Sequence, residues 1–240
     1  MNSISFNTNF TRLLLFKIAL IVSISTAVAG GSSVELNRFT EVDTSSANND
    51  NGGFYNASNH PNAFAFATLQ ADGSIKAWGH SSYGGTGEPA GSGYTKIYSN
   101  GYAFAATKTD GSITAWGASY AGGTSAPSGS GYTKIYSTEY AFAALKADGS
   151  ITAWGASYAG GTSAPSGSGY TKIYSTDGAF AALKADGSIK AWGDSNYGGT
   201  GAPSGNNYIK IYSTGSAFAA LKADGSIKAW GDSRYGGTGA

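Results

Sequence analysis

Residues 183–193 read LKADGSIKAWG, and this motif returns five times along the 240-residue chain. Its tryptophan recurs at a constant spacing of 38 residues, and a phenylalanine and an aspartate recur in step with it. A fixed period of this length is typical of proteins built from one repeated structural unit, such as propellers and solenoids. The tryptophans are Trp78, Trp116, Trp154, Trp192 and Trp230.

Each repeat predicts short β-strands rather than helices. Residues 132–137, 141–146 and 151–154 are rich in β-branched and aromatic side chains, which suit a pleated surface. The step Asp148-Gly149 lies between the last two runs and predicts a hairpin with a tight primed turn. The glycine-rich connection that follows, residues 155–169, has room for one short strand at most.

The composition agrees with an all-β fold, since 13% of the residues are aromatic and only 12% are charged. A sheet of a few short strands has two faces to cover, and neighbouring copies of the same unit cover both. We therefore expect a β-propeller or a propeller-like arc of five 38-residue units, each with three to four antiparallel strands.

The repeat resembles that of the regulator-of-chromosome-condensation family. That family's repeat has an Asp-Gly…Trp-Gly core followed by Asn-x-x-Gly-Gln-Leu-Gly, and residues 183–201 follow this pattern except at Ser195, Gly199 and Thr200. The resemblance covers residues 63–240 and implies a β-propeller, usually of seven blades. It also implies kinship with a short-repeat exported branch that includes a β-lactamase inhibitor protein, whereas no residue of the nuclear exchange activity can be matched.

Residues 1–29 have the features of an export signal. Arg12 and Lys17 precede an apolar stretch, and Ala27-Val28-Ala29 forms a small-x-small cleavage pattern. A retained membrane anchor is the alternative, although the apolar stretch is short for a bilayer span. The sequence thus predicts a secreted, periplasmic or cell-surface protein with no stable membrane insertion once the signal is removed.

Residues 30–62 are predicted to be a linker or an N-terminal cap before the repeat domain of residues 63–240. Residues 44–53 are turn-forming and linker-like, and 34–42 form either one short strand or a tether, of which the tether is preferred. The first unit lacks the strand that corresponds to 94–99. We expect an incompletely or loosely closed ring.

The sequence does not indicate an enzyme, a cofactor or a metal. The Gly-Asp-Ser steps at 193–195 and 231–233 imitate an esterase nucleophile, but His60 and His80 lie outside the repeat consensus. The repeated aspartates lack the second carboxylate of a calcium site, and two histidines without a Cys or acidic cluster are a poor metal site. The chain has no cysteine, and a net charge of +1 gives no reason to expect nucleic acid as a partner.

A repeated set of tyrosines is the candidate binding surface. These residues stand in the glycine-rich loops four or five residues after each tryptophan, and tyrosine offers a large amphipathic contact area. We expect them to bind an extracellular or periplasmic protein; the alternatives are a glycan-binding module with one aromatic platform per unit, or a structural repeat without a ligand. Packing between adjacent units would also explain their recurrence, and is the preferred explanation, because copies that must fit one another also repeat. The residues are Tyr83, Tyr120, Tyr158, Tyr197 and Tyr235.

Overall fold

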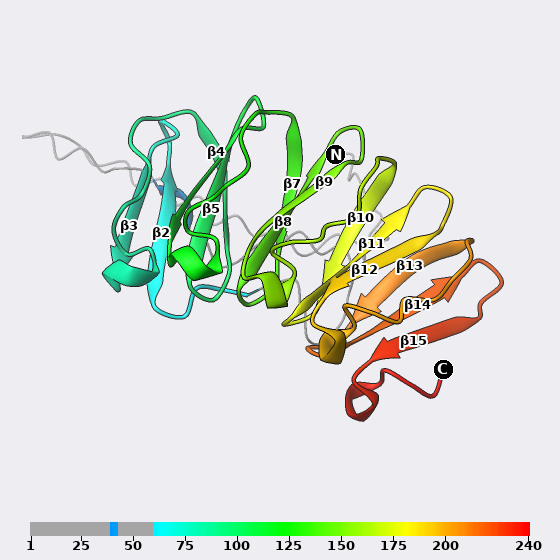
Figure 1. Ribbon diagram of the computed structural model, residues 1–240. Coiled ribbons are helices and arrows are strands. Elements are labelled where there is room, and N and C mark those ends of the chain that lie inside the picture. Colours follow the sequence, from blue (N-terminus) through cyan, green and yellow to red (C-terminus); the bar gives the residue numbers. More distant parts are fainter. Residues whose placement is uncertain (1–38, 43–59) are drawn as a thin grey trace, which may run out of the picture. The chain divides into compact units, whose positions relative to one another are not determined.

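The computed structural model describes residues 39–42 and 60–240, so the export signal expected at 1–29 and most of the linker or cap expected at 30–62 lie outside the described residues. All strands in the described part belong to three-stranded antiparallel sheets. The five sheets follow one another in chain order (Figure 1). The fold class expected from the sequence is therefore confirmed, with three strands in each unit.

The five units share one order of elements, namely three strands followed by a single-turn 3-10 helix. Unit 1 contains β1 (Phe39–Val42), β2 (Ala65–Gln70), β3 (Ile75–Gly79) and η1 (Ser81–Tyr83), and unit 2 contains β4 (Tyr94–Ser99), β5 (Ala103–Lys108), β6 (Ile113–Gly117) and η2 (Ser119–Ala121). Unit 3 contains β7 (Tyr132–Ser137), β8 (Ala141–Lys146), β9 (Ile151–Gly155) and η3 (Ser157–Ala159). Unit 4 contains β10 (Tyr170–Ser175), β11 (Ala179–Lys184), β12 (Ile189–Gly193) and η4 (Ser195–Tyr197). Unit 5 contains β13 (Tyr208–Ser213), β14 (Ala217–Lys222), β15 (Ile227–Gly231) and η5 (Ser233–Tyr235).

The strands lie where the sequence places them, and the glycine-rich connection holds a 3-10 helix rather than a strand. In unit 3 the middle strand β8 pairs with both neighbouring strands. Its Ala143 lies opposite Tyr136 of β7, and its Leu145 lies opposite Ile151 of β9. A bulge interrupts the β7–β8 register between Tyr132 and Lys134, and the same irregularity recurs in every unit.

The Asp-Gly hairpin forms, but the expected primed turn is wrong. A primed turn places its first central residue at positive φ, whereas in this turn only Gly149 does so, at +80°. The Gly149 N–H donates to the Lys146 carbonyl at 3.0 Å, and the Lys146 N–H donates to the Ser150 carbonyl at 2.9 Å. A side chain at Gly149 would also meet the backbone of Tyr170 at 2.6 Å, so glycine is required both by φ and by the next unit.

The hydrophobic core lies between the sheets. Four clusters of buried residues are present, and each combines residues of two successive units. At the boundary of units 2 and 3, the Trp154 ring stacks on Phe142 at 5.1 Å and its Nε1–H donates to the Gly122 carbonyl at 3.1 Å. Because the same contacts recur at Trp116, Trp192 and Trp230, each unit is held chiefly by its neighbours, as expected for a repeat protein.

Backbone hydrogen bonds add a second connection between units. In the turn before the middle strand, the N–H of one unit donates to the carbonyl of the next, giving a ladder with one rung per unit boundary. The rungs are Ala63 to Gly101, Gly101 to Glu139, Glu139 to Asp177 and Asp177 to Gly215, at 2.9–3.2 Å. We call these five residues the turn ladder.

The structure differs from the preferred tether interpretation at β1, which fills the strand position that unit 1 otherwise lacks. Phe39 lies opposite Gln70 and Val42 opposite Thr68, and a bulge separates Phe39 from Glu41. This is the register of β4 on β5, where Tyr94 lies opposite Lys108. Residues 39–42 read FTEV where β4 begins YTKI, so the two segments share an aromatic, Thr, charged, β-branched pattern.

Candidate partner-binding site

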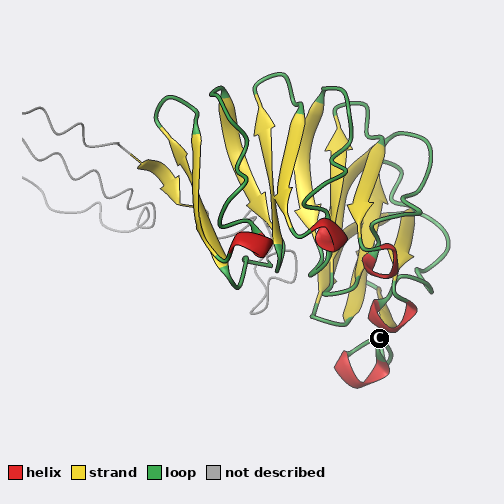
Figure 2. Ribbon diagram, turned by 60° about the vertical axis from the view of Figure 1, so that its left-hand side comes forward, coloured by secondary structure: helices red, strands yellow, loops and turns green. Residues whose placement is uncertain are grey.

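The five predicted tyrosines lie on the 3-10 helices, at the end of the sheets opposite the Asp-Gly hairpins (Figure 2). Their position within the helix differs between two kinds of unit. In units 2 and 3 the tyrosine is the middle residue, so Tyr120 and Tyr158 project into solvent while Ala121 and Ala159 are buried. In the other units it is the last residue, at the place of that alanine.

The residue before the helix also follows the kind of unit. His80, Asp194 and Asp232 each accept a hydrogen bond from a backbone N–H of the helix that follows, whereas Ala118 and Ala156 provide no such cap. The caps fix the turn at both ends of the row of units. Units 2 and 3 replace this polar cap with a buried alanine.

Three of the five tyrosines belong to one continuous group of rings, which we call the aromatic rim cluster. The bridging rings come from the turns just before the middle strands. Tyr83 lies 4.6 Å from Phe64, which contacts Tyr102 at 5.5 Å. Tyr102 stacks on Tyr140 at 4.9 Å, and outer contacts of 5.8 Å add the last two rings. The cluster comprises Phe64, Tyr83, Tyr102, Tyr120, Tyr140 and Tyr158.

Hydrogen bonds hold the centre of the cluster. The hydroxyls of Tyr102 and Tyr140 are 3.3 Å apart, and the Tyr102 hydroxyl donates to Glu139 at 3.5 Å. The hydrogen bond to Tyr102, followed by burial and the Glu139 carboxylate, raises the pKa of Tyr140 well above its ordinary value. Burial is the main cause that raises the pKa of both Tyr120 and Tyr158. The raised pKa values keep the phenols of Tyr120, Tyr140 and Tyr158 neutral at physiological pH.

The cluster ends where the bridging rings end. Unit 4 has Gly178 at the position of Tyr140, and unit 5 has Ser216. A side chain at Gly178 would lie 2.9 Å from the ring of Tyr197, so this glycine allows Tyr197 to fold down over it. Tyr197 is accordingly half-buried, and neither it nor Tyr235 stacks on another aromatic ring within the described ranges.

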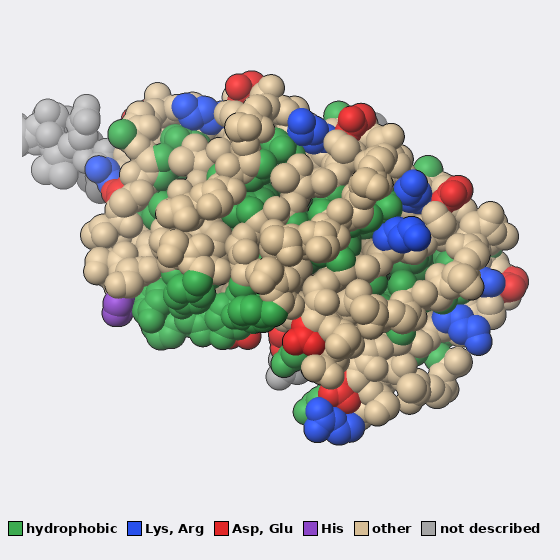
Figure 3. All heavy atoms as spheres, in the orientation of Figure 1, with side chains coloured by type: hydrophobic (Ala, Val, Ile, Leu, Met, Phe, Trp, Pro, Cys, Tyr) green, Lys and Arg blue, Asp and Glu red, His purple; other side chains and the backbone are tan. Residues whose placement is uncertain are grey.

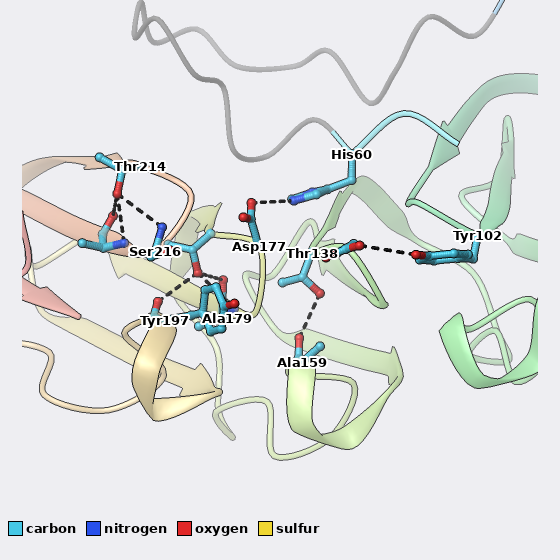
Figure 4. A network of polar contacts seen from close by, with 12 residues as sticks. His60, Tyr102, Thr138, Ala159, Asp177, Ala179, Tyr197, Thr214 and Ser216 are labelled. Carbon is cyan, nitrogen blue, oxygen red and sulfur yellow. Dashed lines mark hydrogen bonds and ion pairs between the residues drawn. The ribbon is translucent and has the colours of Figure 1, made fainter. Parts of the chain in front are cut away.

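A polar surface adjoins the cluster along the turn ladder (Figure 4). His60 Nε2 lies 3.2 Å from the Asp177 carboxylate, although His60 precedes β2 of unit 1 and Asp177 belongs to unit 4. Thr138 and Thr176 donate to the carbonyls of Ala159 and Tyr197, which fixes each 3-10 helix to its own unit. A shallow concavity of about 260 Å³ is lined by His60, Pro61, Ala63, Gly101, Tyr102, Glu139 and Asp177.

The repeated aspartates serve the hairpins. Asp148 Oδ1 accepts hydrogen bonds from the N–H and the hydroxyl of Ser150 at 2.8 and 2.7 Å. The same backbone bond forms at each hairpin, so this carboxylate has a structural role. In the part of the chain that the structure describes, no group of three acidic, His or Cys residues is arranged to hold a metal ion.

No helix among residues 39–42 and 60–240 has the length and apolar character that a membrane span requires.

Sequence reasoning missed the bridging residues Phe64, Tyr102 and Tyr140, and with them Glu139. The available signal was variation along the repeat. One pair of turn residues is different in every unit, while the flanking strands hardly change. These pairs are residues 63–64, 101–102, 139–140, 177–178 and 215–216. Variable turn residues on a constant scaffold are a common place for binding residues.

Comparison with known proteins supports the fold. No protein-family model matches the sequence, and no curated protein matches it. The ectodomain of the Physcomitrella patens receptor kinase CR4 is similar over 71% of this chain and 50% of its own, with 18% identity and a TM-score of 0.53. Prp20p of Saccharomyces cerevisiae, which binds Gsp1p and histones, is similar over 72% of this chain and 56% of its own, with 15% identity and a TM-score of 0.49.

This chain is an all-β protein made of repeated propeller-type units. Yeast RCC1 (Prp20) bound to Kap60 is also similar, over 72% of this chain and 55% of its own, with 15% identity and a TM-score of 0.48. The chain spans about half the length of these solved structures.

Proposed function

We propose that this protein is a non-enzymatic binding module that holds one protein partner on the aromatic rim cluster. The observation that supports the proposal most directly is the continuity of six rings across three units, with Tyr120 and Tyr158 more than half exposed. Figure 3 shows hydrophobic side chains gathered at one edge of the molecule. Contiguous exposed apolar patches mark interaction sites in soluble proteins.

The arrangement favours one extended contact over five equal ones. A lectin-like module with one platform per unit would need five comparable tyrosines whose weak affinities add through avidity. Here units 1–3 share a single cluster, while Tyr197 is folded down over Gly178 and Tyr235 stands apart. A one-to-one complex with a protein surface fits this asymmetry better than repeated binding of sugar rings.

The chemistry of the cluster suits a protein partner. Stacked tyrosines present a rigid apolar surface, and their hydroxyls provide hydrogen bonds at its edge. The contact surface itself consists of aromatic rings, and the carboxylates of Glu139 and Asp177 line the adjoining concavity. Binding should therefore depend weakly on salt and should favour a partner with an apolar centre and a polar rim. We infer from the leader sequence of residues 1–29 that the partner is extracellular or periplasmic.

Affinity capture with matched variants tests the proposal. The full chain is immobilised and exposed to extracellular fractions from the cells that make it, beside a variant with Tyr102, Tyr120 and Tyr158 changed to Ser. The control carries Tyr197→Ser and Tyr235→Ser. We expect the control to retain the captured protein and the triple variant to lose it, with one-to-one stoichiometry in calorimetry of the purified pair.

A glycan array run with the same three proteins provides the opposite outcome. Binding that rises with glycan valency, and that falls equally in the triple variant and the control, would replace the protein-binding proposal with the lectin-like one. Circular dichroism of each variant verifies that the sheets are intact, since the substituted rings lie on the rim.

A further inference from the structure

The first unit exposes two rings that later units bury. Phe66 is 56% exposed, whereas Phe104 at the same repeat position is 1% exposed. Trp78 is 47% exposed and Trp116 only 4%. The two exposed rings still stack on each other at 5.5 Å, as the buried pairs do at 5.1 Å. We call the side of unit 1 that carries them the leading face.

The last unit exposes the complementary side, which we call the trailing face. Ile227 is 47% exposed where Ile189 is 6%, and Tyr212 is 39% exposed where Tyr174 is 4%. In unit 4 the corresponding side chains are buried against the next unit. On the trailing face of unit 5 they are exposed to solvent.

A specific slot accompanies these side chains. At Gly198 an added side chain would meet the Phe218 ring of the following unit at 2.7 Å, and the Gly198 carbonyl accepts the Trp230 Nε1–H. Gly236 holds the same place in unit 5, with φ of 94° against 88°, and nothing lies within 4 Å of it. The slot that takes a Phe-Trp pair at the earlier unit boundaries is open here.

We propose that the trailing face of one molecule binds the leading face of a second copy of this chain, head to tail. Phe66 and Trp78 enter the slot at Gly236, and the Trp78 Nε1–H donates to the Gly236 carbonyl. The contact repeats a boundary that the chain already forms four times, so both surfaces are continuous with an established interface. It joins two different surfaces, and such heterologous contacts propagate until a ring closes or a filament forms.

Complementation between two blocked variants tests this assembly. Trp78→Asp blocks the leading face and Ile227→Asp blocks the trailing face; both residues are exposed, so neither substitution disturbs a core. Sedimentation velocity is measured on the full chain over a range of concentrations. We expect the unaltered chain to self-associate, each variant alone to associate at least tenfold more weakly, and an equimolar mixture of the two to stop at a dimer.

Several results would overturn the proposal. An unaltered chain that stays monomeric at all concentrations would mean that both faces are covered within one molecule. Dimers of Ile227→Asp alone would mean that leading faces pair with each other or that residues 1–38, retained in every variant, cause the association.

Ser128→Asp is the control for the added charge. It places the same charge on an exposed loop of unit 2 and should associate as the unaltered chain does. Phe66→Ser and Tyr212→Ser repeat the experiment without introducing charge.

Discussion

Trp78 and Trp154 occupy the same repeat position in different surroundings, and this contrast gives a matched test of the packing. Trp154→Ala removes a buried ring, its stack on Phe142 and its bond to Gly122. We expect it to lower the free energy of unfolding by about 3–5 kcal/mol. Trp78→Ala should lower it by less than about 1 kcal/mol, since that ring is half in solvent. Urea unfolding of dilute full-length chain measures both, and equal losses would contradict the unit-on-unit core.

The hairpin aspartates make a pH-dependent contribution to stability. The backbone N–H and then the hydroxyl of Ser150 lower the pKa of Asp148 below its ordinary value, and serines act likewise at the other four hairpins. A depressed carboxyl pKa stabilises the fold above the unfolded value of about 3.9, and this stabilisation is lost as the pH falls through the folded value.

Changing all five hairpin aspartates to Asn keeps an acceptor oxygen but removes the titration. We expect the unaltered chain to be more stable than this variant at pH 6 and the difference to shrink at pH 2. The measurement is the urea midpoint of both proteins at the two pH values. A difference that is the same at both would show that the carboxylates contribute nothing by ionising.

At the scale of the element, a glycine of the hairpin and a glycine of the following connection allow the effect of backbone strain to be measured apart from that of steric contact. Gly149 and Gly167 both have positive φ, but only a side chain at Gly149 would meet neighbouring backbone. Gly167→Ala should reduce the unfolding free energy by about 1–2 kcal/mol through φ alone. Gly149→Ala should reduce it further, because β10 must move away. Thermal unfolding of the two variants checks the order, and a smaller effect at Gly149 would be against it.

The strand β1 gives a second element-scale prediction. Deleting residues 39–42 removes the partner of β2, so we expect faster amide exchange in β2 and a lower melting temperature, while exchange in β8 and β11 stays unchanged. Hydrogen exchange with mass spectrometry resolves the segments. Unchanged exchange in β2 would favour the tether interpretation of this segment.

Strand positions were predictable because each carries its own local signal, repeated five times. The turn type at Asp148 was not, since the Asp-Gly step fits both a primed turn and a turn followed by a left-handed glycine. Strand β1 is also hard to predict, because four residues far from β2 in the sequence carry little local information. The tyrosines of the 3-10 helices were recognised as a set, but their grouping depends on Tyr102 and Tyr140, which meet them only through the packing of one unit on the next.

For the whole molecule, the repetition predicts that units can be removed. Residues 111–138 and 149–176 are identical, so deleting 111–148 joins Asp110 to Gly149 without changing any local sequence. We expect a folded four-unit protein whose denaturant m-value is smaller by about one fifth, since m follows the surface exposed on unfolding. Urea unfolding followed by tryptophan fluorescence provides the value. Failure to fold would show that the units cooperate beyond nearest neighbours.

The turn ladder separates what holds the molecule together from what it displays. Its rungs run between main-chain atoms of Ala63, Gly101, Glu139, Asp177 and Gly215, so these hydrogen bonds do not themselves depend on which side chain the following residue carries. Natural selection can therefore exchange residues such as Phe64, Tyr102, Tyr140 and Ser216 one unit at a time while the ladder is kept, whereas a change at Gly178 would also require Tyr197 to move. A gene that grows by duplicating a 38-residue cassette gains one such evolvable position with every copy.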